Sequence, residues 1–205
     1  MRSRPVWIVL ASSFLALSGA SAQRTTTVGP VLGLNIATFG GDDAVNVDSR
    51  TGFLVGGFAA FGLSERFALE PSLLYTQKGG QVEFEEGAEG TIKLTYFQVP
   101  VLARFRFPSG NVTPNLMAGP AIAFRSGCTA SASQGAIEIN VDCDEADVQL
   151  SSTDFSVIFG VGLEFGRFMV SARYDYGLTA IPSEGSDDVF NRTISLVGQY
   201  GFRLK

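Results

Sequence analysis

The sequence has 205 residues, with 15 basic and 20 acidic side chains, no histidine and a formal net charge of −5. An acidic chain has no bulk electrostatic attraction for nucleic acid, and without histidine it lacks the usual general base and the commonest metal ligand. We therefore expect no nucleic-acid partner, no cofactor, no metal site and no enzymatic activity, the alternative being a carboxylate-only or Ser/Asp active site.

The N-terminus has the pattern of an export signal. Arg2 and Arg4 precede an apolar run over residues 6–17, and a small-residue cleavage site, Ala20-Ser21-Ala22, follows it. The run is shorter than the roughly 18–20 residues that a spanning helix needs. The sequence therefore predicts a signal peptide over residues 1–22 and a single β-barrel domain over residues 23–205.

Eight segments of the mature chain are predicted to be β-strands. Five of them alternate apolar side chains with other residues at a period of two and are rich in valine and aromatic residues, and three further apolar runs complete the set. The eight predicted strands span residues 28–37, 52–63, 67–76, 96–107, 114–125, 155–165, 168–176 and 194–204.

The connections between these strands alternate in length. Long polar connections span residues 39–50, 79–91, 127–153 and 179–191, and short ones span residues 64–66, 108–112 and 166–167. The long connections hold 15 of the 20 acidic residues and one basic residue, Arg50. An antiparallel up-and-down barrel in an outer membrane combines short periplasmic turns with long outer loops, and has an even number of strands.

Aromatic residues mark the ends of the apolar faces. Four of these faces begin and end with an aromatic residue, as Phe97 and Phe107 do, over spans of 9 to 11 residues. A tilted membrane strand needs about 9–11 residues, and aromatic girdles border its apolar band. The predicted fold is an all-β, eight-stranded antiparallel up-and-down transmembrane barrel, monomeric and in contact with lipid in the outer membrane of a Gram-negative-type bacterium.

Several segments carry a family resemblance. The segment YFQVPVLARFRF, from Tyr96 to Phe107, resembles the proline-containing strand of the PorT-like outer-membrane β-barrel proteins of Bacteroidetes-type bacteria. The segments MAGPAIAF, FGVGLEF, ARYDYGL and VGQYGFRL follow in the order typical of that family. The resemblance covers residues 27–205 and implies an eight-stranded outer-membrane barrel, a family in which some members are associated with gliding or protein secretion.

The faces opposite the apolar ones are predicted to line the lumen. They carry side chains of both signs, which can pair across a narrow barrel whose interior is about filled by side chains. We therefore predict an ionic plug, with a narrow porin-like path as the alternative. The predicted lumen residues are Glu70, Gln98, Arg104, Arg106, Arg125, Glu164, Arg173 and Asp175.

Proline is a difficulty for this assignment. Four predicted strands contain a proline, which cannot donate to a ladder, and a closed barrel has no edge to receive it. We expect a bulge or a missing ladder bond at each of Pro30, Pro71, Pro100 and Pro120.

The longest predicted loop holds both cysteines, Cys128 and Cys143. An even cysteine count in an exported protein favours a disulfide, here a structural clip, with two free thiols as the alternative. The same loop contains Asp142, Asp144, Glu145 and Asp147. These carboxylates could bind Ca²⁺, but they lack an EF-hand pattern and favour a solvated acidic loop.

The predicted function is that of an outer-membrane barrel with a structural or interaction role, in which the acidic outer loops contact a possible protein partner. The alternative is a soluble periplasmic, lipocalin-like barrel that binds an apolar ligand. These two hypotheses assign opposite faces of the same strands to the interior.

Overall fold

The computed structural model describes residues 25–41, 47–83, 88–134, 137–143, 150–181 and 189–204. The predicted signal peptide lies outside the described residues, and the described residues include no helix that is long and apolar enough to span a membrane. The strands are β1 (Thr26–Gly40), β2 (Val47–Gly62), β3 (Phe67–Glu83), β4 (Ala88–Arg106), β5 (Thr113–Gln134), β6 (Ile137–Asp142), β7 (Thr153–Phe165), β8 (Phe168–Ala180), β9 (Phe190–Tyr200) and β10 (Phe202–Leu204).

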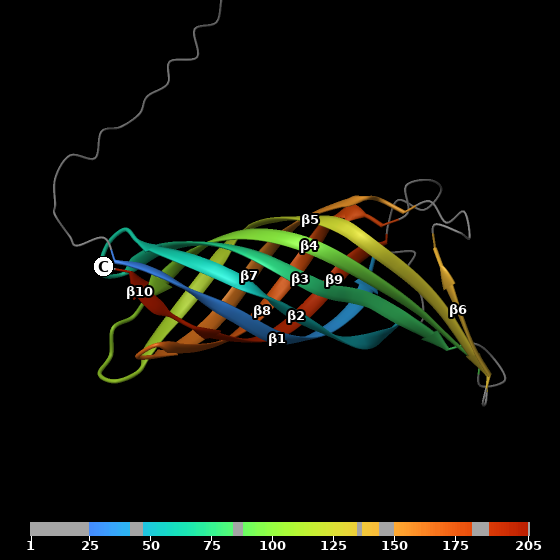
Figure 1. Cartoon of the computed structure of the whole chain (residues 1–205), viewed down its shortest axis with the longest axis horizontal. Helices are drawn as coiled ribbons and strands as arrows, with labels where there is room; N and C mark the ends of the chain where they lie inside the picture. The colour runs from blue at the N-terminus through green and yellow to red at the C-terminus, as the bar shows by residue number, and fades with distance from the viewer. Residues whose placement is uncertain are drawn as a thin grey trace, which may run out of the picture.

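The strands form a closed antiparallel barrel (Figure 1). Eight strands form the ring, in the order β1-β2-β3-β4-β5-β7-β8-β9, and each pairs with its neighbours in that order. The ring closes because β9 pairs with β1. β10 continues β9 past Gly201 and also pairs with β1, whereas β6 pairs with β5 outside this ring. The predicted eight-stranded fold is confirmed, because β9 and β10 together form the predicted last strand.

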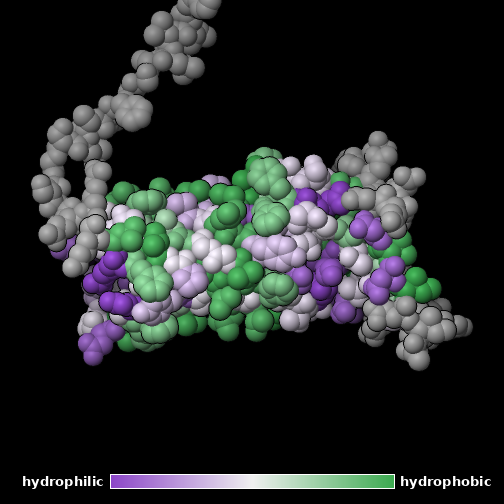
Figure 2. Space-filling view, viewed as in Figure 1, coloured by the Kyte–Doolittle hydropathy of each residue, from purple (hydrophilic) through white to green (hydrophobic). Residues whose placement is uncertain are grey.

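The apolar faces of the strands lie on the outside of the barrel. In β4, the side chain of Phe97 is 48% exposed, whereas Arg104 on the opposite face is 5% exposed. Hydrophobic residues gather over the middle of the barrel surface, and hydrophilic ones at its two ends (Figure 2). The lipocalin-like alternative is wrong for this fold, because it requires the Phe/Val face to line the interior.

Two zones of aromatic side chains mark the predicted membrane boundaries. Near the short turns, Phe67 stacks edge-on against Phe105 at 4.8 Å between ring centroids, and Phe168 packs against Tyr200 at 4.7 Å. Toward the long loops, the ring of Tyr75 lies 5.7 Å from that of Phe97. We call the end with the short connections the turn end and the opposite end the loop end.

The strand prolines interrupt the ladder on one side only. Pro71 pairs with Val101 of β4, but on its other side the β2–β3 pairing passes from Phe58–Ser72 to Phe61–Leu69. The same one-sided gap of two residue pairs, without a change of register, occurs at Pro30, Pro100 and Pro120. The predicted missing bonds are therefore found, and the bulges lie elsewhere, at Ser49/Leu54, Thr95/Tyr96 and Tyr176/Ala180.

At two of these gaps the backbones approach closely enough to require glycine. A Cβ on Gly29, which precedes Pro30, would lie 1.7 Å from the carbonyl oxygen of Tyr200, and a Cβ on Gly119, which precedes Pro120, would lie 2.0 Å from that of Val101. The Gly-Pro pairs thus let neighbouring strands stay close where the ladder is interrupted.

The long predicted loops are partly strand, which corrects the sequence prediction. β3 and β4 pair continuously as far as Glu83 and Glu89, and β5 extends to Gln134, where β6 turns back along it. β5 has 22 residues, about twice the 9–11 that cross a membrane. The β4–β5–β6 sheet therefore projects beyond the barrel at the loop end, as Figure 1 shows.

Candidate functional site

The polar interior of the barrel is the candidate functional site. Strand alternation directs every second side chain inward, so that residues from distant parts of the sequence meet in the lumen. The buried charged residues of the described lumen separate into two groups, one toward the turn end and one toward the loop end.

The first group, the turn-side cluster, consists of Glu70, Arg104, Arg106, Glu164, Arg173 and Gln199. Its centre is Glu70 of β3, a side chain 1% exposed, whose carboxylate forms ion pairs with Arg104 and with Arg173, the latter at 3.4 Å. Gln199 donates to Glu70 Oε1 at 2.9 Å and accepts from Arg173 Nη2 at 2.9 Å. One carboxylate thereby joins β3, β4, β8 and β9 across the lumen.

The same cluster extends toward the turn end through Glu164 of β7. Its carboxylate lies 3.5 Å from Arg104 Nη1 and 3.7 Å from Arg106 Nε, and both Glu164 and Arg106 are about a quarter exposed. The turn-side cluster contains three guanidinium groups and two carboxylates, which leaves one positive charge without a partner charge inside it.

The second group, the loop-side cluster, consists of Lys78, Tyr96, Gln98, Asp154, Asp175 and Asn191. Lys78 Nζ lies 2.9 Å from Asp175 and 3.5 Å from Asp154. Gln98 donates to Asp175 at 2.7 Å, and Asn191 donates to Asp154 at 2.9 Å and to Tyr96 Oη at 3.3 Å. This cluster has one ammonium group and two carboxylates, the reverse of the imbalance at the turn side.

A further buried amide links the barrel wall next to the loop-side cluster. Asn35 of β1 donates to Thr76 Oγ1 at 2.9 Å and to the carbonyl oxygen of Gln77 at 2.8 Å, and accepts from Ser195 at 2.8 Å. Because a buried amide needs partners for its polar atoms, these bonds fix β3 and β9 relative to β1.

Apolar side chains fill much of the rest of the described interior. Leu102, Met117 and Ile158 pack on one wall, and Val31, Leu74 and Val197 on another. With the two polar clusters they fill most of the lumen, as expected of an eight-stranded barrel, and cavities remain at the turn end.

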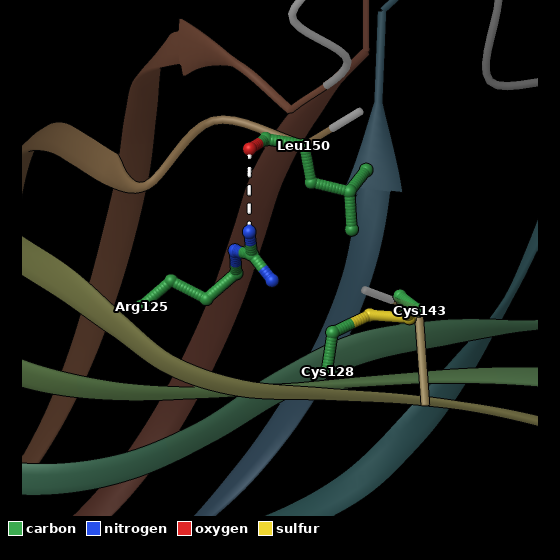
Figure 3. Close-up of a disulfide and its surroundings, with 4 residues drawn as sticks. All are labelled: Arg125, Cys128, Cys143 and Leu150. Atoms are coloured by element: carbon green, nitrogen blue, oxygen red, sulfur yellow. Dashed lines mark hydrogen bonds between the residues drawn. A yellow bond between two sulfur atoms is a disulfide. The ribbon is translucent and has the colours of Figure 1, made fainter. Parts of the chain in front are cut away.

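The two cysteines form the disulfide that the sequence predicts, and the segment that it closes is the paired end of β5 and β6 instead of an irregular loop. Cys128 lies on β5 and Cys143 follows β6, with 5.4 Å between their Cα atoms (Figure 3). The two cysteines are 15 residues apart in the sequence, and closing a loop of that length adds about 3 kcal/mol or less to the free energy of unfolding by restricting the unfolded chain. Both residues are buried in an apolar cluster with Leu94, Tyr96 and Ile181 at the loop end of the lumen.

The structure places the eight predicted lumen residues in different surroundings. Five belong to the turn-side cluster and two, Gln98 and Asp175, to the loop-side cluster. Arg125 lies beside the disulfide and donates to the carbonyl oxygen of Leu150 at 3.4 Å (Figure 3). Of the four carboxylates considered for Ca²⁺, Asp144, Glu145 and Asp147 lie outside the described residues.

Sequence reasoning missed several members of these clusters. Lys78 and Asp154 fall just beyond the predicted strand ends, although both continue the inward alternation, Lys78 two residues after Thr76 and Asp154 two residues before Ser156. Extending each alternating list by one step would have found them. Gln199 stands on the inward side of the last predicted strand but is not among the predicted lumen residues, and Asn191 lies in a predicted loop, residues 179–191.

Comparison with known proteins agrees with this architecture. The family model for the outer membrane protein beta-barrel domain matches residues 19–182. Neisserial surface protein A is 16% identical, with coverage of 85% of this chain and 97% of that chain and a TM-score of 0.51. No curated protein sequence matches this chain.

Two further solved structures align over most of the chain. Ail of Yersinia pestis, solved in complex with the heparin analogue sucrose octasulfate, is 18% identical over 86% of this chain and 99% of its own, with a TM-score of 0.44. The outer membrane enzyme PagL is 16% identical over 82% of this chain and 98% of its own, with a TM-score of 0.41.

Proposed function

This chain belongs to the family of proteins with an outer membrane β-barrel domain, and from that premise we propose that it is a sealed barrel with a structural and interaction role. It is a protein of the Gram-negative outer membrane. In such barrels the short turns face the periplasm and the long loops face outside. The turn end is therefore periplasmic and the loop end extracellular.

The two buried ionic clusters are the main support for a sealed lumen. Five of their charged side chains face the interior of the barrel and are each at most 6% exposed: Glu70, Arg104, Arg173, Lys78 and Asp175. A water-filled path would leave such side chains hydrated. The cross-lumen ion pairs instead tie opposite walls together, which favours a structural plug over a narrow porin-like path.

Planar-bilayer recordings test this proposal. The refolded mature protein is expected to give no steady single-channel conductance, because charged and apolar side chains fill its lumen. Heat-denatured protein at the same concentration is the matched control for leaks caused by detergent. A reproducible unitary conductance from the folded protein alone would show that a solute path exists.

The extracellular end is proposed as the surface that contacts a partner protein. It holds most of the acidic residues, and the projecting β4–β5–β6 sheet adds exposed apolar side chains, Ile92, Ile139 and Val141, along a groove of about 310 Å³. Exposed apolar residues rimmed by charge are typical of protein-binding surfaces.

Cross-linking in the native cell tests this contact surface. A photoreactive residue at Ile139 is expected to capture a distinct protein, whereas one at Leu63, a residue equally exposed at the periplasmic end, is not expected to capture the same protein. Identical adduct patterns from the two positions would contradict an extracellular contact.

A non-enzymatic role is supported by the absence of histidine. The segments from Tyr96 onward that resemble PorT-like proteins favour that group within the family. Residues 1–22 are proposed as a cleaved signal peptide, and the closed pairing of all eight barrel strands is compatible with a monomer.

A further inference from the structure

A cavity opens at the periplasmic end of the lumen, below the turn-side cluster. Its volume is about 370 Å³, and its walls include Thr27, Ser64, Arg106, Glu164 and Arg203. A smaller cavity of about 40 Å³ shares Thr27, Glu164 and Arg203 with it and is bounded by Arg104 and Gln199. The two cavities, which we call the vestibule, therefore lead from the periplasmic mouth to the buried ion pairs.

The vestibule carries an excess of positive charge. Its walls contain four guanidinium groups, those of Arg104, Arg106, Arg167 and Arg203, and two carboxylates, those of Glu65 and Glu164. Glu164 is shared between Arg104 and Arg106, Arg104 also pairs with Glu70 above the vestibule, and Glu65 is exposed at the rim. Even with Glu70 counted, four guanidinium groups face three carboxylates, so an anion that enters would meet a net positive charge.

Two of these guanidinium groups have buried donors with unused capacity. The side chain of Arg104 is only 6% exposed, and its Nε is buried without a hydrogen-bond partner within the described part of the chain. Arg106 Nε is also buried, and Glu164 Oε2, which has no hydrogen-bond partner among the described residues either, is 3.7 Å away, too far for a hydrogen bond. Buried charged donors are normally satisfied, so these two N–H groups are suited to bind an acceptor that enters the vestibule.

We propose that the vestibule binds a small oxyanion, a phosphate or carboxylate group, from the periplasm. Arg106 and Arg203 hold the anion by charge-assisted hydrogen bonds, and Arg104 forms the floor of the site. Hydroxyl groups of Thr27 and Ser64 are available on the wall as further donors. Ser64 Oγ accepts bonds from the backbone N–H groups of Arg66 and Phe67, which leaves its own proton free to donate.

The test is a titration of the refolded mature protein in detergent micelles with inorganic phosphate at low ionic strength, followed by NMR of the arginine Nε–H groups. Saturable shifts are expected at two or more arginine resonances, and Arg203→Gln should weaken binding about fivefold or more by removing one charge-assisted contact. Arg203→Lys should recover part of the loss. Arg66→Gln is the matched control, because Arg66 is exposed in a periplasmic turn but lines neither cavity, and it should change the affinity less than twofold.

A second arm distinguishes the source of the anion. D-alanyl-D-alanine, which carries a carboxylate, is titrated at matched ionic strength. Tighter binding than phosphate assigns the site to carboxylate-bearing peptides, and tighter phosphate binding assigns it to free phosphate. Linear, non-saturating shifts with both probes, or equal weakening by Arg66→Gln and Arg203→Gln, would overturn the proposal. Because orientation in the membrane does not enter these measurements, their outcome is independent of the conductance and cross-linking results.

Discussion

Replacing Glu70 with alanine is expected to lower the free energy of unfolding by about 3–5 kcal/mol, the range for removing one partner of a buried ion pair. Glu70 is 1% exposed and neutralises Arg104 and Arg173, while Gln199 also donates to it. Without the carboxylate, two guanidinium groups stay in the lumen with their charges facing each other. The loss of this charge therefore costs more than the hydrogen bonds it made.

The unfolding of this variant is best followed without fluorescence, because Trp7, the only tryptophan, lies in the predicted signal peptide. Urea titrations in phospholipid vesicles, read by the mobility of unheated samples on gels and by far-ultraviolet circular dichroism, give the free energy. Glu65→Ala, at an exposed turn, is the control and should change stability by less than about 0.5 kcal/mol. A Glu70→Ala variant as stable as Glu65→Ala would show that Glu70 does not hold the lumen together.

The barrel itself could be predicted because its surroundings impose a strict alternation. Lipid requires an apolar side chain at every second position, and the narrow lumen accepts the others. The spacing in the sequence is therefore enough to predict that Phe97 faces lipid and that Arg104 faces the lumen. Phe97 is exposed and Arg104 buried, as that alternation requires.

The strand ends could not be predicted in the same way. Beyond the lipid, both faces of a strand meet water or protein, and the pattern that lipid imposes disappears. β3, β4 and β5 therefore continue through segments whose composition favours loops, such as residues 79–83 with two glycines. Lys78 was not predicted for this reason, since it lies where β3 passes from the lipid-embedded part of the barrel to the part beyond the lipid.

The pairing of charges across the lumen depends on the register of the whole barrel. Arg104 and Glu70 come from neighbouring strands, and their contact follows from the β3–β4 register, in which Arg104 lies opposite Ala68. Arg173 and Glu70 are 103 residues apart on strands that do not pair. No local pattern encodes that contact, because it depends on how strand tilt and stagger close the barrel.

Replacing Val101 with arginine is expected to destabilise the barrel by about 2–4 kcal/mol in a phospholipid bilayer, the range for a charge on the lipid face near the midplane. Val101 lies on β4 midway between Phe97 and Phe105 and belongs to the same outward-facing list. An arginine there points into the lipid, on the side of the strand away from the lumen carboxylates. Its charge must therefore draw water or headgroups toward the middle of the membrane.

Leu63→Arg is the matched control for this substitution. Leu63 is 63% exposed and precedes Phe67 at the periplasmic rim, so its arginine reaches the headgroup region, where the cost falls to about 0–1 kcal/mol. Both variants are unfolded by urea in the same vesicles and compared with the unchanged protein. Equal stabilities for the two variants would mean that the Val101 face does not contact the membrane core, whereas a difference of at least about 1 kcal/mol follows if the Phe/Val face is the lipid face and the arginine face is the lumen.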